Sequence, residues 1–228
     1  MTTLDRFAIA QQFHRNVQVS RAQIFGGNDP VPLHLREDAE TMFAGYVGPD
    51  YKPGGVVLLA INPGGGGDAY SYRTPEDQRL YPLLRAFKSA TPENAFPIFE
   101  RINDELARVI NSWNLRKIVM PTIEAAGVRF SEICYLNAVP YRTREDRLPS
   151  VAAKKSAWSL VVAPTLRLIQ PKAVIALGMK AGDALSRNHS GAERAYVVPR
   201  SIGDSRITPD AQVVLNQIRQ DFHTGVGS

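Results

Sequence analysis

The sequence predicts an α/β fold: a single three-layer domain, residues 1–228, with a mostly parallel central sheet of about four strands and helices on both faces. Two observations lead to this class. Short apolar runs bounded by glycine or proline alternate with longer segments whose apolar residues recur at helical spacing. The clearest run, residues 56–61, is apolar at every position, which is typical of a strand covered on both faces.

The predicted elements alternate in the order that a parallel sheet requires. Thr208 and Pro209 suit the cap and first turn of the last helix, and Pro164 should kink or divide the long helix that contains it. The N-terminal segment, residues 1–50, should pack on the domain as helices. In chain order we expect helices at residues 4–19 and 35–46, a strand at 56–61, helices at 78–90, 96–113 and about 121–126, a strand at 133–139, a helix at 151–170, a strand at 173–178, a helix at 179–186, a strand at 195–198 and a helix at 208–222.

Composition narrows the class of protein. No stretch approaches the roughly 18 apolar residues of a membrane span, and no apolar signal segment follows Met1. We therefore expect a soluble, cytoplasmic protein that does not contact membranes. We also expect it to be a monomer. The single cysteine, Cys134, lies in an apolar run and excludes an internal disulfide or a four-thiolate metal site. The net charge of +5 favours polyanionic partners.

A glycine-rich loop follows the first predicted strand. The strand ends at Asn62 and Pro63, and four glycines, residues 64–67, come next. Because ligands bind beyond the carboxyl ends of parallel strands, we expect Asn62, Asn137 and the basic loops at residues 142–147 and 200–206 to share one rim of the sheet.

The glycine loop alone does not identify a ligand. Gly64, Gly66 and Ala69 satisfy a dinucleotide-binding spacing, but that fingerprint requires a helix to open at the glycines, and residues 70–75 are poor helix formers. No Gly-Lys-Ser/Thr follows, which excludes a phosphate-binding P-loop. From this loop alone, a tight connection without any ligand fits the sequence about as well as a ligand site does.

Four segments resemble motifs of the uracil-DNA glycosylase superfamily. Residues 60–64, Ala-Ile-Asn-Pro-Gly, resemble the first motif, G-[IM]-N-P-G, of its mismatch-specific and single-strand-selective branches. Residues 72–75, Tyr-x-x-Pro, fall where those branches place an aromatic residue. Residues 135–139 resemble a strand that carries an asparagine, and residues 171–178 are similar to a recurrent P-K-x-[IV]-[IV]-x-L-G strand. The resemblance extends from about residue 56 to residue 206.

The resemblance implies a uracil-DNA glycosylase-like fold and a monofunctional DNA glycosylase of base-excision repair, which needs no cofactor or metal. Its partner would be DNA that contains uracil or another deaminated base. Asn62 would position the hydrolytic water, Tyr72 would stack on the extruded base, and Asn137 would hydrogen-bond to its pyrimidine edge. Gly64 and Tyr70 are also expected at the base.

Each of these residues also has a simpler interpretation. Asn62 is a common turn residue after a strand, Tyr72 could pin the loop, and a buried Asn137 could be satisfied by backbone groups.

One motif of the family is incomplete. Where the superfamily has His-Pro-Ser after the last strand, residues 198–201 read Val-Pro-Arg-Ser, so the histidine that stabilises the departing base is missing. We expect Arg200 and Ser201 to contact the leaving group or a phosphate. Phosphate contacts are also expected of three further arginines, Arg142, Arg144 and Arg206.

Two rival functions remain open, one suggested by the missing histidine and one by the glycine loop. The chain could be a nucleic-acid-binding module of the same fold that has lost catalysis with its histidine. It could also be a nucleotide- or phosphate-binding enzyme that uses the loop at residues 64–67.

Overall fold

Five strands form one sheet, in the order β1-β3-β2-β4-β5, within the part of the chain that the computed structural model describes: residues 5–27, 30–32, 38–64, 75–112, 114–188, 190–200 and 206–223. β2, β3, β4 and β5 run parallel, and β1 pairs with β3 in the antiparallel sense. The four predicted strands are therefore confirmed. The strand bounds are β1 Tyr46–Val47, β2 Val56–Ala60, β3 Ile133–Asn137, β4 Ala173–Leu177 and β5 Arg194–Val198.

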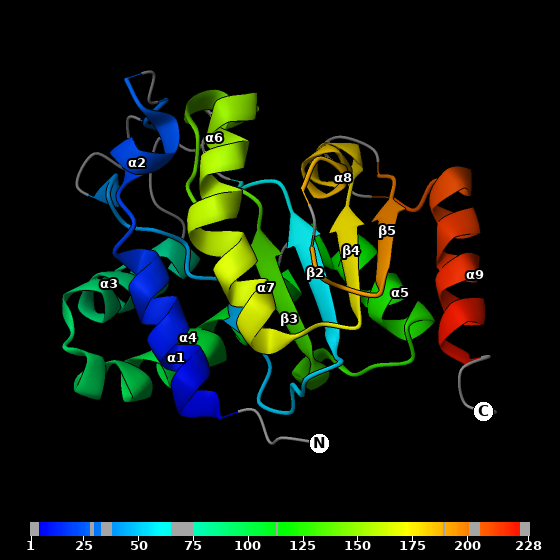
Figure 1. The fold of residues 1–228 in the computed structure, drawn as a ribbon, viewed down its shortest axis with the longest axis horizontal. Coiled ribbons are helices and arrows are strands. Elements are labelled where there is room, and N and C mark those ends of the chain that lie inside the picture. Colours follow the sequence, from blue (N-terminus) through cyan, green and yellow to red (C-terminus); the bar gives the residue numbers. More distant parts are fainter. Residues whose placement is uncertain are drawn as a thin grey trace.

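Helices cover both faces of this sheet, as predicted for a three-layer α/β domain. In the view of Figure 1, α1, α6 and α7 lie in front of the sheet and α5 lies behind it. The α-helices are α1 Arg6–Val17, α2 Arg21–Phe25, α3 Pro75–Ser89, α4 Pro92–Ser112, α5 Arg116–Ala125, α6 Val151–Ala157, α7 Ala163–Ile169, α8 Met179–Ser186 and α9 Pro209–His223. None of the described helices is both long and apolar enough to cross a membrane.

The helix predicted at residues 35–46 is wrong beyond residue 38, which is 3-10 helical. Residues 41–45 are not helical, and Tyr46 belongs to β1. The reason is tertiary: the Phe43 N–H donates to the Pro140 carbonyl, and Tyr46 pairs with Tyr135 of β3. The backbone of this segment therefore bonds to the neighbouring strand and its loop. The apolar residues that suggested a helix are buried because the whole segment is covered, not because they share one face of a helix.

The long helix predicted at residues 151–170 is divided, as Pro164 suggested. α6 and α7 are joined by the π-helical turn Trp158–Val162, and Pro164 lies at the start of α7. Directly before Pro164, the Ala163 N–H donates to the Trp158 carbonyl, which is the hydrogen bond of a π turn, and Pro164 itself has no N–H to donate.

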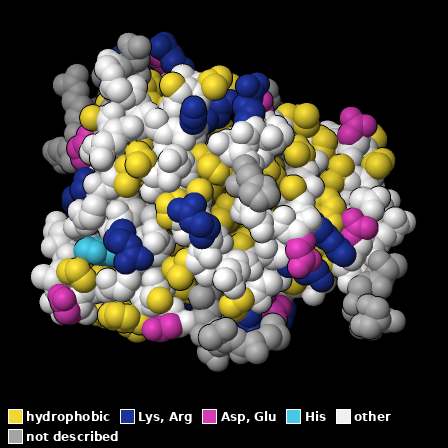
Figure 2. All heavy atoms as spheres, in the orientation of Figure 1, with side chains coloured by type: hydrophobic (Ala, Val, Ile, Leu, Met, Phe, Trp, Pro, Cys, Tyr) yellow, Lys and Arg dark blue, Asp and Glu magenta, His cyan; other side chains and the backbone are white. Residues whose placement is uncertain are grey.

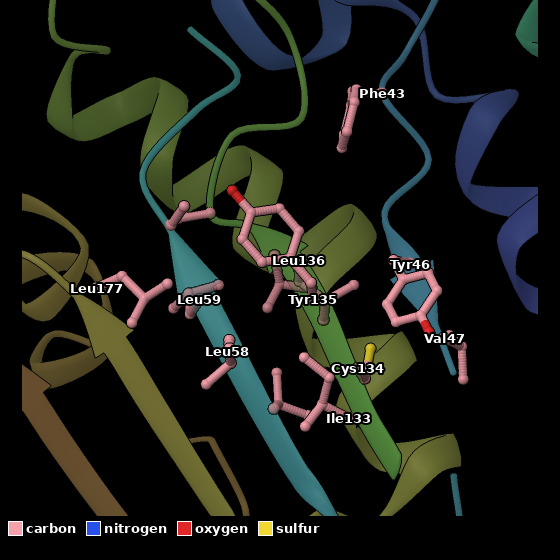
Figure 3. Close-up of a cluster of buried hydrophobic side chains, with 14 of the residues drawn as sticks. Phe43, Tyr46, Val47, Leu58, Leu59, Ile133, Cys134, Tyr135, Leu136 and Leu177 are labelled. Carbon is pink, nitrogen blue, oxygen red and sulfur yellow. The ribbon is translucent and has the colours of Figure 1, made fainter. Parts of the chain in front are cut away.

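The core surrounds the central strands. Every residue of β2, β3 and β4 is buried, which confirms that helices cover the sheet on both faces. Figure 3 shows Leu58 and Leu59 of β2 beside the side chains of β3, including Cys134, whose thiol is free and fully buried. Burial raises the pKa of Cys134, so the thiol stays protonated. The last residue of β3, Asn137, is the exception in this apolar strand.

Candidate active site

Asn62 and Asn137 lie at the same edge of the sheet. Asn137 ends β3 opposite Ala60, the last residue of the parallel neighbour β2, and Asn62 follows shortly after. The parallel pairing continues past the strands, because the Val139 N–H donates to the Ile61 carbonyl at 2.8 Å. Asn62 and Asn137 therefore lie at one rim of the sheet, as the rule for strand ends predicted.

The Asn137 amide is buried and makes no hydrogen bond to the described residues. Asn137 is 4% exposed, and neither Oδ1 nor Nδ2 of its side chain has a hydrogen-bond partner among the described residues. Leaving a buried polar group unpaired costs about 1–3 kcal/mol. The simpler interpretation, in which backbone groups satisfy Asn137, is not what the structure shows. An amide held this way is suited to a ligand that supplies both a donor and an acceptor.

Asn62 is oriented by a residue that the sequence analysis missed. Its Nδ2 donates to Thr143 Oγ1 at 3.2 Å and, more weakly, to the Pro63 carbonyl at 3.4 Å. Thr143 is fully buried and donates its own proton to the Arg147 carbonyl at 2.6 Å. Thr143 lies inside the basic loop at residues 142–147 that was predicted at the rim, but nothing in the sequence around it indicates a contact with Asn62.

Arg142 has a different role from the predicted phosphate contact. Both of its terminal nitrogens bond to the Asp77 carboxylate, at 2.8 and 2.9 Å, and its guanidinium lies over the Tyr81 ring. The Arg142 side chain is only 10% exposed. Although burial lowers the pKa of Arg142, Tyr81 and Asp77 raise it, and the net shift is upward. Asp77 lies in the first turn of α3, so this pair joins α3 to the loop after β3.

Arg200 lies over the end of the neighbouring strand β4. Gly178 follows β4 with a positive φ of 104°, and a Cβ there would be 3.2 Å from Arg200 Nε, so a larger residue would displace the arginine. Burial raises the pKa of Tyr135 on β3, and the charge of Arg200 lowers it. Arg200 therefore acts on the same edge as Asn137, which shares a face of β3 with Tyr135.

The other predicted residues are less involved with this edge or lie outside the described part. The Arg144 side chain is 44% exposed and near Glu145, and Arg206 and Gly64 are exposed. Tyr70, Tyr72 and Ser201 lie outside the described residues, so their predicted roles stay predictions. Figure 2 shows several Lys and Arg side chains near the upper margin of this face, toward which the strands of Figure 1 point.

The described residues offer no evident metal centre. Within them, no three His, Cys, Asp or Glu side chains are grouped as ligands. His14 stacks edge-on against Phe87, and His223 lies near Gly127 at the end of α9. The chemistry that these groups present at the carboxyl edge comes from amides, a hydroxyl and a guanidinium.

The fold and the site thus define a three-layer α/β protein with a candidate ligand site at the carboxyl edge of its parallel strands. Comparison with known family models and with curated protein sequences gives no match. The function has to be inferred from the chemistry of the edge.

Proposed function

We propose that the chain is a DNA glycosylase that hydrolyses the N-glycosidic bond of uracil, or of another deaminated base, in DNA. The observation that carries the proposal is the Asn137 amide, buried and without a partner among the described residues, at the same carboxyl edge as Asn62. An amide presents one acceptor oxygen and a nitrogen with two donors. Uracil presents the complementary groups, an N3–H donor and an O4 acceptor, once the base has left the DNA stack.

Asn62 supports the second half of the reaction. Its half-buried amide is fixed by Thr143, and such a group can orient a water molecule beneath the sugar. An amide is a poor general base, so the proposal places its effect in positioning the water while positive charge develops on the sugar. The net charge of +5 favours the polyanionic substrate.

The direct test is incubation with single- and double-stranded oligonucleotides that contain uracil, followed by alkali to cleave abasic sites. We expect alkali-labile product from the wild type. The absence of product from every deaminated-base substrate, at stoichiometric protein, would contradict the proposal. Binding of the oligonucleotides without product would favour the rival function, a nucleic-acid-binding module.

Two substitutions assign the amides. Asn62→Ala should slow the single-turnover rate at saturating DNA far more than it weakens binding, because a water-positioning group acts mainly in the transition state. Asn137→Asp replaces the donor that faces O4 with an acceptor, so uracil excision should be lost. A folded Asn137→Asp variant with normal excision would remove Asn137 from base recognition.

Arg200→Ala separates the two roles proposed for this arginine. If Arg200 stabilises the departing base, the variant should lower the single-turnover rate at saturating DNA. If it binds phosphate, affinity should fall and its salt dependence should become shallower, with the rate preserved. Arg219, exposed on α9 and outside the predicted site, offers a matched control, and normal rate and salt dependence for Arg200→Ala would place Arg200 outside the site.

A further inference from the structure

The orientation of the Asn62 amide follows from the hydrogen bonds of Thr143. A threonine hydroxyl carries a single proton, and Thr143 donates that proton to the Arg147 carbonyl at 2.6 Å. Oγ1 can then only accept a hydrogen bond. The Asn62 atom that faces it at 3.2 Å must therefore be Nδ2, the nitrogen that carries protons.

A second acceptor selects the same orientation. The Pro63 carbonyl lies 3.4 Å from Asn62 Nδ2 and, like Thr143 Oγ1, has no proton to offer. The two branches of a planar amide diverge, so Oδ1 faces away from Thr143. The amide is thus set to present its oxygen, an acceptor, on the side opposite Thr143.

The backbone of the loop is shaped to keep the Arg147 carbonyl at Thr143. Glu145 and Asp146 both have left-handed backbone angles, with φ of 56° and 51°. This conformation costs non-glycine residues about 1 kcal/mol or more each. It turns the chain so that the Arg147 carbonyl returns to the Thr143 hydroxyl. The buried Arg142–Asp77 pair holds the residue that precedes Thr143.

We propose that Thr143 is a positioning residue that presents Asn62 Oδ1 as an acceptor to the attacking water. The inference rests on the proposed glycosylase function. In that reaction the water oxygen bonds to C1′, the C1′–N bond breaks, and its electron pair stays on the base. The water loses one proton to solvent, the departed base takes one up, and Asn62 itself accepts only a hydrogen bond.

The core supplies a matched control for this arrangement. Asn16 Nδ2 donates to Thr165 Oγ1 at 2.8 Å, and Thr165 donates to the Val161 carbonyl at 2.8 Å. The chemistry is the same as at Asn62, but this pair joins α1 to α7. Thr165→Val should therefore lower stability without changing the reaction rate.

The first test does not depend on activity. In ¹⁵N-labelled protein, the side-chain amide signals of Asn62 are assigned by their loss in Asn62→Ala. Thr143→Val should shift these signals and speed their hydrogen exchange about tenfold, whereas Thr143→Ser should preserve both. Unchanged Asn62 signals and exchange in Thr143→Val would overturn the inference, even if the protein excises uracil.

The second test measures single-turnover excision at saturating DNA. Thr143→Val should lower the rate about tenfold with little change in affinity, and Thr143→Ser should restore it. In the Asn62→Ala background, Thr143→Val should have no further effect, because Thr143 acts through Asn62. An equal loss in that background would show a purely structural role and overturn the inference. If the wild type excises no base, the proposed function fails, while the amide signals still decide whether Thr143 orients Asn62.

Discussion

Two buried asparagines, Asn103 and Asn137, differ in the hydrogen bonds of their side chains. Asn103 on α4 is 3% exposed, accepts a hydrogen bond from the Val47 N–H at 2.7 Å and donates to the Phe99 carbonyl at 2.8 Å. Asn137 is buried to the same degree, but its amide makes no such bonds to described residues. Burial of the same side chain therefore stabilises the fold in one place and opposes it in the other.

This contrast predicts that replacing asparagine by leucine changes the free energy of unfolding in opposite directions at positions 137 and 103. Asn137→Leu should raise the free energy of unfolding by about 1 kcal/mol, because an apolar side chain of similar size removes an unsatisfied amide. Asn103→Leu should lower it by about 2 kcal/mol, because the Val47 N–H loses its partner. Urea denaturation of both variants measures the difference. A clear loss of stability in Asn137→Leu would mean that its amide is satisfied in the native protein.

At the scale of elements, a buried ion pair ties α3 to the loop after β3. Asp77 is in the first turn of α3, and Arg142 follows β3 by a few residues. The two side chains are 65 residues apart in the sequence. The start of α3 is therefore held against the rim.

Asp77→Asn should lower the free energy of unfolding by about 3 kcal/mol, because it leaves the Arg142 guanidinium buried without its counter-charge. The control is Arg187→Ala, which breaks the exposed i,i+4 pair with Asp183 on α8 and should leave stability unchanged. Urea denaturation at fixed pH compares the two. Equal small effects would show that Asp77 and Arg142 do not depend on each other.

The elements that could be predicted from sequence are those with local signals. The parallel strands and most helices have their own apolar period and their own glycine or proline boundaries, and the placement of Asn62 and Asn137 follows from the rule for strand ends. β1 escaped prediction because its two residues are extended only by pairing with β3. Thr143 was missed for a similar reason, since it lies 81 residues from Asn62. Contacts over such separations leave no periodic pattern in the chain.

At the scale of the whole molecule, several tyrosines are held protonated. Burial raises the pKa of Tyr46 to about 12, and burial together with a hydrogen bond to Asp221 raises that of Tyr196 to about 12. Burial also raises the pKa values of Tyr51 and Tyr135. In the unfolded chain a tyrosine ionises near pH 10. Between about pH 10 and pH 12 the unfolded state therefore binds fewer protons than the folded state.

Stability should accordingly change little with these groups below about pH 10 and fall as the pH rises toward 12. Urea denaturation midpoints at pH 8, 10 and 11 would measure the decline. Tyr46→Phe should make it shallower, since phenylalanine cannot ionise in either state. A midpoint that stays constant up to pH 11 would contradict the assignment of raised pKa values to these tyrosines.

The buried position of Cys134 allows the opening of the sheet to be measured by thiol labelling. This thiol is the only one in the sequence, it is buried at the second position of β3, and a reagent can reach it only when the sheet opens. The rate at which a thiol reagent labels Cys134 therefore reports how often β3 is exposed to solvent, in seconds or hours, without any engineered probe. If a base binds to Asn137 on the same strand, as the proposed function requires, it should slow the labelling of Cys134. The labelling rate should fall further as the concentration of the base rises above its dissociation constant.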